Sequence, residues 1–285
     1  MCMLSLLNIL FSDLYNIIIN SKMDEKTLES LRTNLKKTFK TTDLGVFVRS
    51  DTNVEDLPGF TGAGLNLTMP NVIGFDTLLK AINQVWASPF TRRAFAWRQS
   101  HMEQPQYVYP SILLLRSVSN DKSGVLVTED IDTGNRDIIS IAVNEGVGGA
   151  VDGQSAESLR VNMSDASVLV LATATAPLRR QPSSKGGLDK LPVSGSETLL
   201  QPKEIAQMIE FAKELPQKFP SIVDDAGNPA PADVEFGFLD GELHLFQLRP
   251  FLQNHSVQGT AYLVNMDKAL HGTADVKVNM TGVPK

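Results

Sequence analysis

DVEFGFLDGELHLFQLRPF, residues 233–251, is a stretch in which polar and apolar side chains largely sort by parity. The large apolar residues at even positions are Val234, Phe236, Phe238, Phe246 and Leu248. The polar residues at odd positions are Asp233, Glu235, Gln247 and Arg249, whereas Leu243, His244 and Leu245 break the pattern. Because successive strand residues point to opposite faces, two strands joined at Asp240-Gly241 would have one apolar face and one largely charged face.

The length of the turn decides whether the two polar sets meet. A two-residue loop would put Glu235 and Gln247 on opposite faces, and a three-residue loop, with Gly241 in a left-handed bulge position, would put them on one face. Binary patterning favours the three-residue loop, because a slip of one residue would bury charges. Asp233, Glu235, Gln247 and Arg249 then share one face, and every large even-numbered apolar residue lies on the other. Such a polar face could hold a metal ion and a phosphate, or it could simply be the solvated face of a hairpin.

The composition excludes several classes of protein. The chain has 285 residues, of which 42% are hydrophobic and 20% charged, which is typical of an ordinary soluble globular protein. A net charge of −6 argues against a nucleic-acid-binding protein, although a local basic groove for ATP remains compatible with it. The single cysteine, Cys2, excludes an internal disulfide framework and a cysteine zinc cluster, and a cytoplasmic location is the simplest inference.

The apolar N-terminus predicts a helix and not a membrane segment. Residues 3–20 have apolar positions at helical spacing, which indicates an amphipathic or buried helix. No basic residue precedes Lys22, and Asp13 interrupts the apolar run, so neither a signal peptide nor a membrane-spanning helix fits.

The rest of the chain mixes helices with strands. Periodicity predicts helices over 24–40 and Pro202–Lys218, and a helical pattern over 74–101 that Pro89 interrupts. The expected strands are Val46–Val48, Ser111–Val118, Gly124–Thr128, Ile138–Val143, Ser158–Val161 and 167–173. The segments rich in glycine or in turn-forming residues are 58–69, expected to be a hairpin or flap, 144–154, expected to be a loop, and 177–198, expected to be a mobile loop. Strands without regular βαβ alternation indicate an α+β fold, and the sequence contains neither a GxxxxGK[ST] loop nor a GxGxxG helix start.

In chain order these segments resemble the ATP-binding domain of the dikinase family, which includes phosphoenolpyruvate synthase, pyruvate phosphate dikinase, glucan water dikinase and rifampicin phosphotransferase. The segments that carry the resemblance are VRSDTNVEDLPGFTGAG (48–64), INQVWASPFTRRAFAWR (82–98), SGVLVTEDIDTG (123–134), the glycine loop 144–153 and DVEFGFLDGELHLFQLRP (233–250). The resemblance implies an ATP-grasp-like fold, in which two lobes with antiparallel sheets clamp the nucleotide. It places this domain at 46–252, after a helical lead-in over 1–45 and before a linker or C-terminal tail over 253–285.

The resemblance also assigns site residues. Arg49 and Arg249 match arginines that contact ATP phosphates, and Asp233 matches an essential acid beside them. Glu235 and Gln247 match the pair at the metal–phosphate site, where Mg²⁺ takes a few oxygen ligands together with phosphates. Gly62 and Gly64, in the 58–69 flap, would approach the phosphates with their backbone N–H groups. Without the resemblance, Arg49 could equally pair with Glu55 or Asp56, and the glycines could form a plain turn.

The chain departs from the family pattern in three places. The glycine-rich segment with a phosphate-contacting lysine has no counterpart, so the first lobe is expected to be truncated or replaced. The strand that holds adenine usually contains a glutamine, and Leu113–Val118, LLLRSV, has none. No TSH-type histidine motif occurs, so a phosphohistidine domain and an acceptor domain would belong to another segment or chain.

The resulting expectation is the ATP-binding portion of a dikinase-type phosphotransferase. It would bind Mg-ATP for phosphoryl transfer to a histidine on another domain or chain, without nucleic acid or membrane as a partner. The alternative is a non-catalytic nucleotide-binding remnant or sensing module that keeps the fold without turnover.

Overall fold

The structure is a computed structural model that describes residues 2–41, 44–54, 56–57, 60–61, 67–151, 153–220, 222–224 and 227–251. Residues Met1–Phe251 form one compact unit, and the expectation of a linker or tail over 253–285 falls outside the described residues. Helices and antiparallel sheets are mixed within this unit, so the α+β class is confirmed.

The first half of the unit is built around a three-stranded antiparallel sheet in the order β4-β1-β5. Its strands are β1 (Val46–Thr52), β4 (Thr68–Val72) and β5 (Pro110–Arg116). The helices are α1 (Cys2–Ile19), α2 (Glu25–Phe39), α3 (Phe75–Ala87) and α4 (Arg92–His101), with a short 3₁₀ turn, η1 (Ser88–Phe90), between the last two. The predicted interruption at Pro89 is therefore confirmed, because Pro89 lies within η1.

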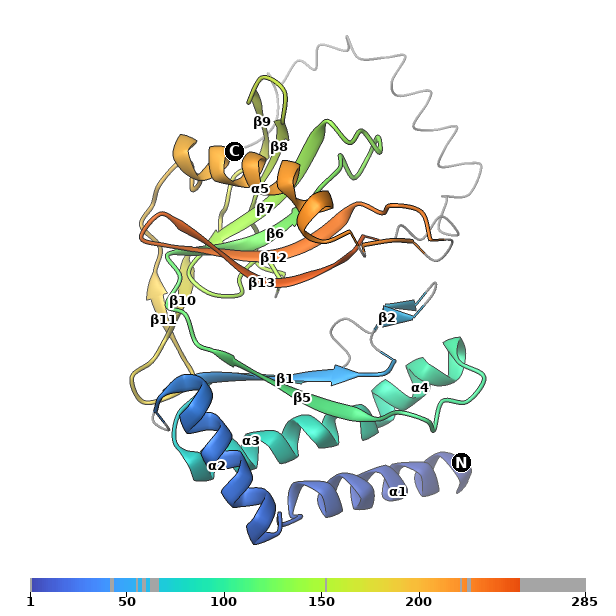
Figure 1. Cartoon of the computed structure of the whole chain (residues 1–285). Coiled ribbons are helices and arrows are strands. Elements are labelled where there is room, and N and C mark those ends of the chain that lie inside the picture. Colours follow the sequence, from blue (N-terminus) through green and yellow to red (C-terminus); the bar gives the residue numbers. More distant parts are fainter. Residues whose placement is uncertain are drawn as a thin grey trace, which may run out of the picture. The chain divides into compact units, whose positions relative to one another are not determined.

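One face of this sheet packs on helices (Figure 1). Val46 and Val48 of β1 are buried against Leu78, Ile82 and Val85 of α3. Other members of the same cluster include Leu35 of α2 and Val72 of β4. Alternation along β1 then directs Phe47, Arg49 and Asp51 to the face opposite α3. The helical packing thus decides which face of β1 presents Arg49.

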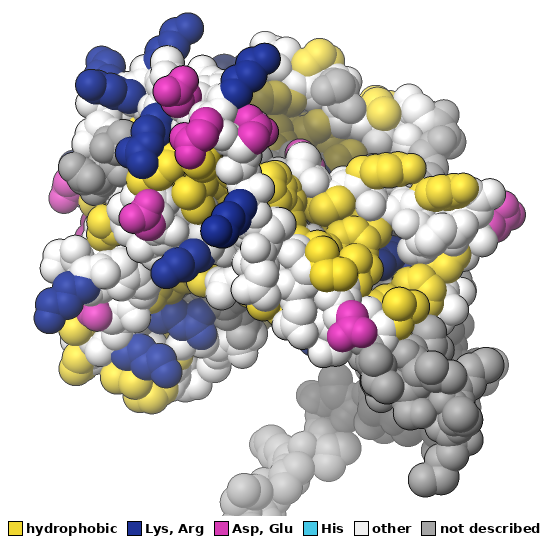
Figure 2. Space-filling view, turned by 90° about the horizontal axis from the view of Figure 1, so that it is seen from below, with side chains coloured by type: hydrophobic (Ala, Val, Ile, Leu, Met, Phe, Trp, Pro, Cys, Tyr) yellow, Lys and Arg dark blue, Asp and Glu magenta, His cyan; other side chains and the backbone are white. Residues whose placement is uncertain are grey.

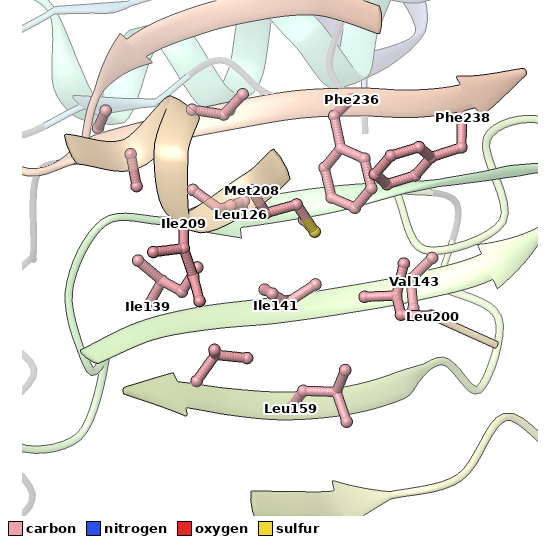
Figure 3. Close-up of a cluster of buried hydrophobic side chains, with 14 of the residues drawn as sticks. Leu126, Ile139, Ile141, Val143, Leu159, Leu200, Met208, Ile209, Phe236 and Phe238 are labelled. Carbon is pink, nitrogen blue, oxygen red and sulfur yellow. The ribbon is translucent and has the colours of Figure 1, made fainter. Parts of the chain in front are cut away.

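The second half is a six-stranded antiparallel sheet in the order β13-β12-β6-β7-β8-β9, with α5 (Pro202–Lys218) covering one face (Figure 1). Its strands are β6 (Lys122–Val127), β7 (Ile138–Glu145), β8 (Glu157–Asn162), β9 (Val168–Ala172), β12 (Ala232–Leu239) and β13 (Glu242–Pro250). Met208 and Ile209 of α5 pack between residues of these strands, including Ile141, Phe236 and Phe238 (Figure 3). This core anchors β12, the strand that carries Asp233 and Glu235.

Two buried carboxylates hold the segment that leads into α5 in place. Glu157, which is 1% exposed, accepts the backbone N–H groups of Leu199 and Leu200 at 2.8 and 3.3 Å. Glu204, in the first turn of α5, accepts from the Lys122 ammonium at 2.6–2.7 Å and from the backbone N–H of Gln201. These charge-assisted contacts satisfy groups that would be costly to bury alone.

The turn between β12 and β13 differs from the expectation. Leu239 pairs with Glu242, so the loop is the two-residue Asp240-Gly241, and the predicted three-residue loop is wrong. Both loop residues have positive φ, 52° and 79°, as a tight hairpin turn of this type requires. The register instead shifts farther along, between Glu235 and Phe236, where β13 contributes one unpaired residue, Phe246.

This bulge explains why parity changes along β13. Before it, Leu243 faces the core together with its partner Phe238; after it, Leu248 faces the core together with Val234. The prediction that every large even-numbered apolar residue shares the core face is wrong for Phe246. A ring carbon of Phe246 lies 2.7 Å from the position that a Cβ on Gly237 would take. Phe246 therefore covers the face of the sheet that points away from the core.

Residues 178–192 were expected to belong to a mobile loop and instead form a hairpin. Strand β10 (Leu178–Pro182) pairs with β11 (Leu188–Pro192) in antiparallel register. The two strands contribute no residue to the two buried hydrophobic clusters, and their hydrogen bonds to other segments take the place of apolar packing. Because this segment is rich in Pro, Ser, Gly and Lys, it lacks the alternation of polar and apolar residues that would predict a hairpin.

Two apolar surfaces remain exposed on the described part of the unit. All five residues of β9, the edge strand of the six-stranded sheet, are exposed. In α1, Leu10 and Ile17 are exposed, and in the view from below Lys and Arg gather mainly on the left, whereas apolar side chains are spread over both sides (Figure 2). None of the helices in the described residues combines the length and apolar character needed to cross a bilayer.

The hairpin offers a matched test of this core. Phe236 is 2% exposed and its cross-strand partner Leu245 is 42% exposed. Phe236→Ala should lower the free energy of unfolding by about 3–5 kcal/mol, because it leaves a cavity under α5. Leu245→Ala should cost about 1 kcal/mol or less in urea denaturation followed by circular dichroism. Equal losses in the two variants would contradict the assigned difference in burial between these two side chains.

Candidate functional site

The β12–β13 hairpin brings four predicted residues together as two cross-strand pairs. Glu235 lies opposite Gln247, and Asp233 lies opposite Arg249. Directly opposed residues point to the same side of a sheet, so all four share one face, as predicted, although the bulge at Phe246 and not the turn produces this result. The Arg249 Nε donates to Asp233 Oδ2 at 2.8 Å.

Arg49 reaches this face from the other sheet. It lies on β1, between Thr68 of β4 and Leu113 of β5. Its Nη1 donates to Glu235 Oε2 at 3.3 Å, and its Nη2 donates to Gln247 Oε1. One guanidinium therefore contacts both members of the cross-strand pair. The predicted association of Arg49 with Glu235 and Gln247 is present in the geometry.

The charges at this face balance, with two guanidinium groups and two carboxylates in partly buried positions. The side chains of Arg49 and Glu235 are each 21% exposed, and those of Arg249 and Asp233 are 26% and 17% exposed. Such exposure lets solvent or a ligand reach the groups while reducing the screening that a fully hydrated pair would have.

The predicted glycine residues belong to the segment between β1 and β4. Gly62 and Gly64 lie outside the described residues, as does most of the 58–69 segment. The described parts of this region include the short strands β2 (Asp56–Leu57) and β3 (Phe60–Thr61), which pair with each other, and β4 begins at Thr68. The expectation of a hairpin or flap over 58–69 thus falls mostly outside the described residues.

The donor set at Glu235 and Gln247 fits a hard cation. A carboxylate oxygen and an amide oxygen converge on one positive group, the Arg49 guanidinium. Mg²⁺ takes a small number of such oxygens and completes its shell with water and phosphate. The described residues contain no group of three or more His, Cys, Asp or Glu side chains arranged around a metal position, so these residues would hold an ion only together with other ligands.

Sequence reasoning missed two further features, of which the first lies beside the site. Leu113, directly opposite Arg49 on β5, is 46% exposed and gives an apolar surface next to the guanidinium. The sequence feature that could have indicated this surface is a leucine on the outward face of a strand whose inward face, Ile112 and Leu114, is already apolar. A separate cavity of about 450 Å³ lies beside α2, and its lining is Arg32, Thr33, Lys36, Lys40 and Thr41, none of them a predicted site residue.

The family model of the pyruvate phosphate dikinase AMP/ATP-binding domain matches residues 7–268. The chain belongs to this family. Membership agrees with the resemblance seen in the motifs at 48–64 and 233–250, and it supports ATP as a ligand of the domain.

Members of the family with curated functions are much longer than this chain. Rifampicin phosphotransferase of Bacillus subtilis is 27% identical over 206 residues, which cover 71% of this chain and 23% of the relative. Phosphoenolpyruvate synthase of Pyrococcus furiosus is 30% identical over 227 residues, which cover 76% of this chain and 27% of the relative. The chain thus spans about a quarter of the length of these relatives.

The contact of Arg49 with Glu235 predicts a measurable coupling between the two sheets. In a double-mutant cycle of Arg49→Met with Glu235→Gln, we expect a coupling energy of about 1 kcal/mol in urea unfolding, because the pair is partly buried. The matched control is Lys218→Met with Glu214→Gln, an exposed helical pair at 2.5 Å, with an expected coupling of about 0.3 kcal/mol. A coupling at Arg49 no larger than that of the control would contradict the contact.

Proposed function

We propose that this chain is the ATP-binding part of a dikinase-type phosphotransferase and that Mg-ATP binds at the face formed by Arg49, Glu235, Gln247, Asp233 and Arg249. The observation that carries the proposal is the contact of one Arg49 guanidinium with both Glu235 and Gln247. It joins two sheets at the residues that the family motifs single out. The arrangement of two antiparallel sheets supports an ATP-grasp-like domain.

In this proposal Arg49 exchanges partners when the nucleotide binds. Its planar guanidinium, which contacts carboxylate and amide oxygens in the structure, is equally suited to phosphate oxygens. Glu235 and Gln247 would then be available as ligands of Mg²⁺, which when bound neutralises phosphate charge and orients the phosphoryl group. Gly62 and Gly64 would add backbone N–H donors.

Arg249 and Asp233 would act as a unit. The 2.8 Å hydrogen bond from Arg249 Nε to Asp233 Oδ2 fixes one side of the guanidinium. The Nη groups of Arg249 can then be presented to a phosphate in a defined orientation, which is what phosphoryl transfer needs most from a protein. Asp233 thereby organises the site without contacting the ligand.

We propose further that the phosphoryl group passes to a histidine on another domain or chain, and from there to an acceptor bound elsewhere. The aligned segments cover only 23% and 27% of these relatives, which are about three times as long as this chain, so they have room for such domains. A cytoplasmic location, with neither nucleic acid nor membrane as partner, agrees with the negative net charge and the single cysteine.

Isothermal titration calorimetry with Mg-ATP tests the binding site. Glu235→Ala and Arg249→Ala should each weaken binding about tenfold or more, because a lost charge-assisted contact costs about 1.5–3 kcal/mol. Glu235→Ala should also make binding much less dependent on Mg²⁺, so that its affinity resembles that of the unaltered chain in EDTA.

Glu210→Ala and Lys213→Ala, at exposed positions of α5, are the matched controls and should bind like the unaltered chain. Absence of Mg-ATP binding in the unaltered chain, or equal affinity in all variants, would rule out the proposed site.

Transfer of phosphate separates the enzyme from the non-catalytic alternative. The full chain, incubated with a histidine domain from a dikinase-family protein and radiolabelled Mg-ATP, should produce an acid-labile, base-stable phosphohistidine. Arg49→Ala should abolish the label. Tight Mg-ATP binding without any phosphohistidine would favour the remnant or sensing module.

A further inference from the structure

Asn71 on β4 connects the two halves of the unit through its side chain. The Asn71 Nδ2 group donates one hydrogen bond to Ser183 O and another to Gly187 O, both at 2.8 Å. In return, Gly187 N–H donates to Asn71 O at 2.9 Å. Ser183 and Gly187 form the tip of the β10–β11 hairpin, so three hydrogen bonds hold this tip against the sheet that carries Arg49.

The surroundings of Asn71 are shaped for this contact. Asn71 is 3% exposed and has a φ of 47°, a left-handed conformation that asparagine tolerates better than most residues. A Cβ on Gly45 would lie 2.0 Å from Asn71 Oδ1, so glycine is required there to make room for the amide. The positive φ of Asn71 and the space left by Gly45 together allow the Asn71 amide to reach the hairpin tip.

The middle of the same hairpin is bonded to the other half. Val147 N–H donates to Arg180 O at 2.9 Å, beside an isolated bridge between Gly146 and Arg180 at the end of β7. Gln181 Nε2 donates to Asn120 O at 2.8 Å. Asn120 lies in the segment that carries the chain from β5 to β6. The hairpin therefore reaches from the six-stranded sheet to β4.

The hairpin tip and the connecting segment attach at the same end of β1. Ser117 N–H, at the start of the connecting segment, donates to Gly45 O at 2.9 Å, and Val46 pairs with Val72 next to Asn71. Arg49 is three residues farther along, about 10 Å at the usual rise of a strand. Figure 1 shows β10 and β11 beside the point where the chain passes from β5 to β6.

This arrangement has a mechanical consequence. A single connecting segment would let the two sheets twist as well as swing about it. Two attachments side by side define an axis and suppress twisting, leaving the rotation that carries Arg49 toward or away from Glu235 and Gln247. Since a phosphate site loses activity with displacements of about 1 Å, suppression of twist matters for the ligand.

We propose that Asn71 is a positioning residue for the Mg-ATP site, acting through the β10–β11 hairpin to keep Arg49 aligned with Glu235 and Gln247. The inference rests on the proposed function for its ligand, but its geometric part concerns the protein alone. The side-chain hydrogen bonds of Asn71 go to Ser183 and Gly187, which lie outside the proposed site.

Asn71→Asp is the sharpest variant. Aspartate keeps the shape and also tolerates positive φ, but it replaces the donating NH₂ with an oxygen that faces two carbonyl oxygens. Asn83→Asp is the matched control. Asn83 is also buried, and its Nδ2 also donates to two backbone carbonyls, Ile19 O and Ser21 O, but both lie within the first half of the unit.

The readouts are a distance distribution and an affinity. Spin labels on Lys80→Cys of α3 and Lys213→Cys of α5, in a Cys2→Ser background, report the relation of the two sheets by double electron–electron resonance. Asn71→Asp should broaden the distribution and weaken Mg-ATP binding roughly two- to thirtyfold. Asn83→Asp should lower thermal stability and leave both readouts unchanged at temperatures where the protein is folded.

An unchanged distance distribution in Asn71→Asp would overturn the inference, and so would a broadened distribution with unaltered Mg-ATP affinity. If the unaltered chain does not bind Mg-ATP, the proposed function fails, whereas the label distances still decide whether Asn71 aligns the sheets. Should Asn71→Asp not fold, Asn71→Gly removes the amide without strain at φ 47° and must give the same broadening.

Discussion

One extra residue in β13 determines the chemistry of the hairpin. The two-residue turn at Asp240-Gly241 starts a register that, continued unchanged, would turn Gln247 and Arg249 toward the core. Phe246 is unpaired, and the shift that it causes places these two side chains opposite Glu235 and Asp233 on the other face. The alternative would bury a guanidinium and an amide beneath α5, where each unsatisfied group would cost several kcal/mol. The bulge thus reconciles a tight turn with a polar face.

Sequence reasoning succeeded where a local pattern reports a local structure. The helix of Pro202–Lys218 was predicted from its apolar stripe and its proline, and its observed bounds are the same. The predicted loop length was wrong because two arrangements put Glu235 and Gln247 on the same face. One is a three-residue loop, and the other is a two-residue loop followed by a bulge. The signal for a bulge was present: Leu243 and Leu245 are apolar at odd positions, and Leu248 is apolar at an even one.

Contacts between distant segments could not be derived from periodicity. Arg49 and Glu235 are 186 residues apart, and nothing in the composition around either one indicates the other. The family resemblance supplied that association, and the sheets supply its physical cause, since burial of Val48 against α3 obliges Arg49 to face away from the helices. The β10–β11 hairpin was not predicted either. Its partners are backbone groups and one asparagine, which leave no apolar pattern.

The edge strand β9 has a consequence for handling the protein. Val168, Leu169, Val170 and Leu171 are exposed in a strand that pairs on one side with β8 and contains neither a charge nor a proline. Natural edge strands usually carry such residues as protection against pairing with another chain. In concentrated solution this edge is where intermolecular sheet extension would begin, and a single lysine in place of Val170 would discourage it without touching the Arg49 face.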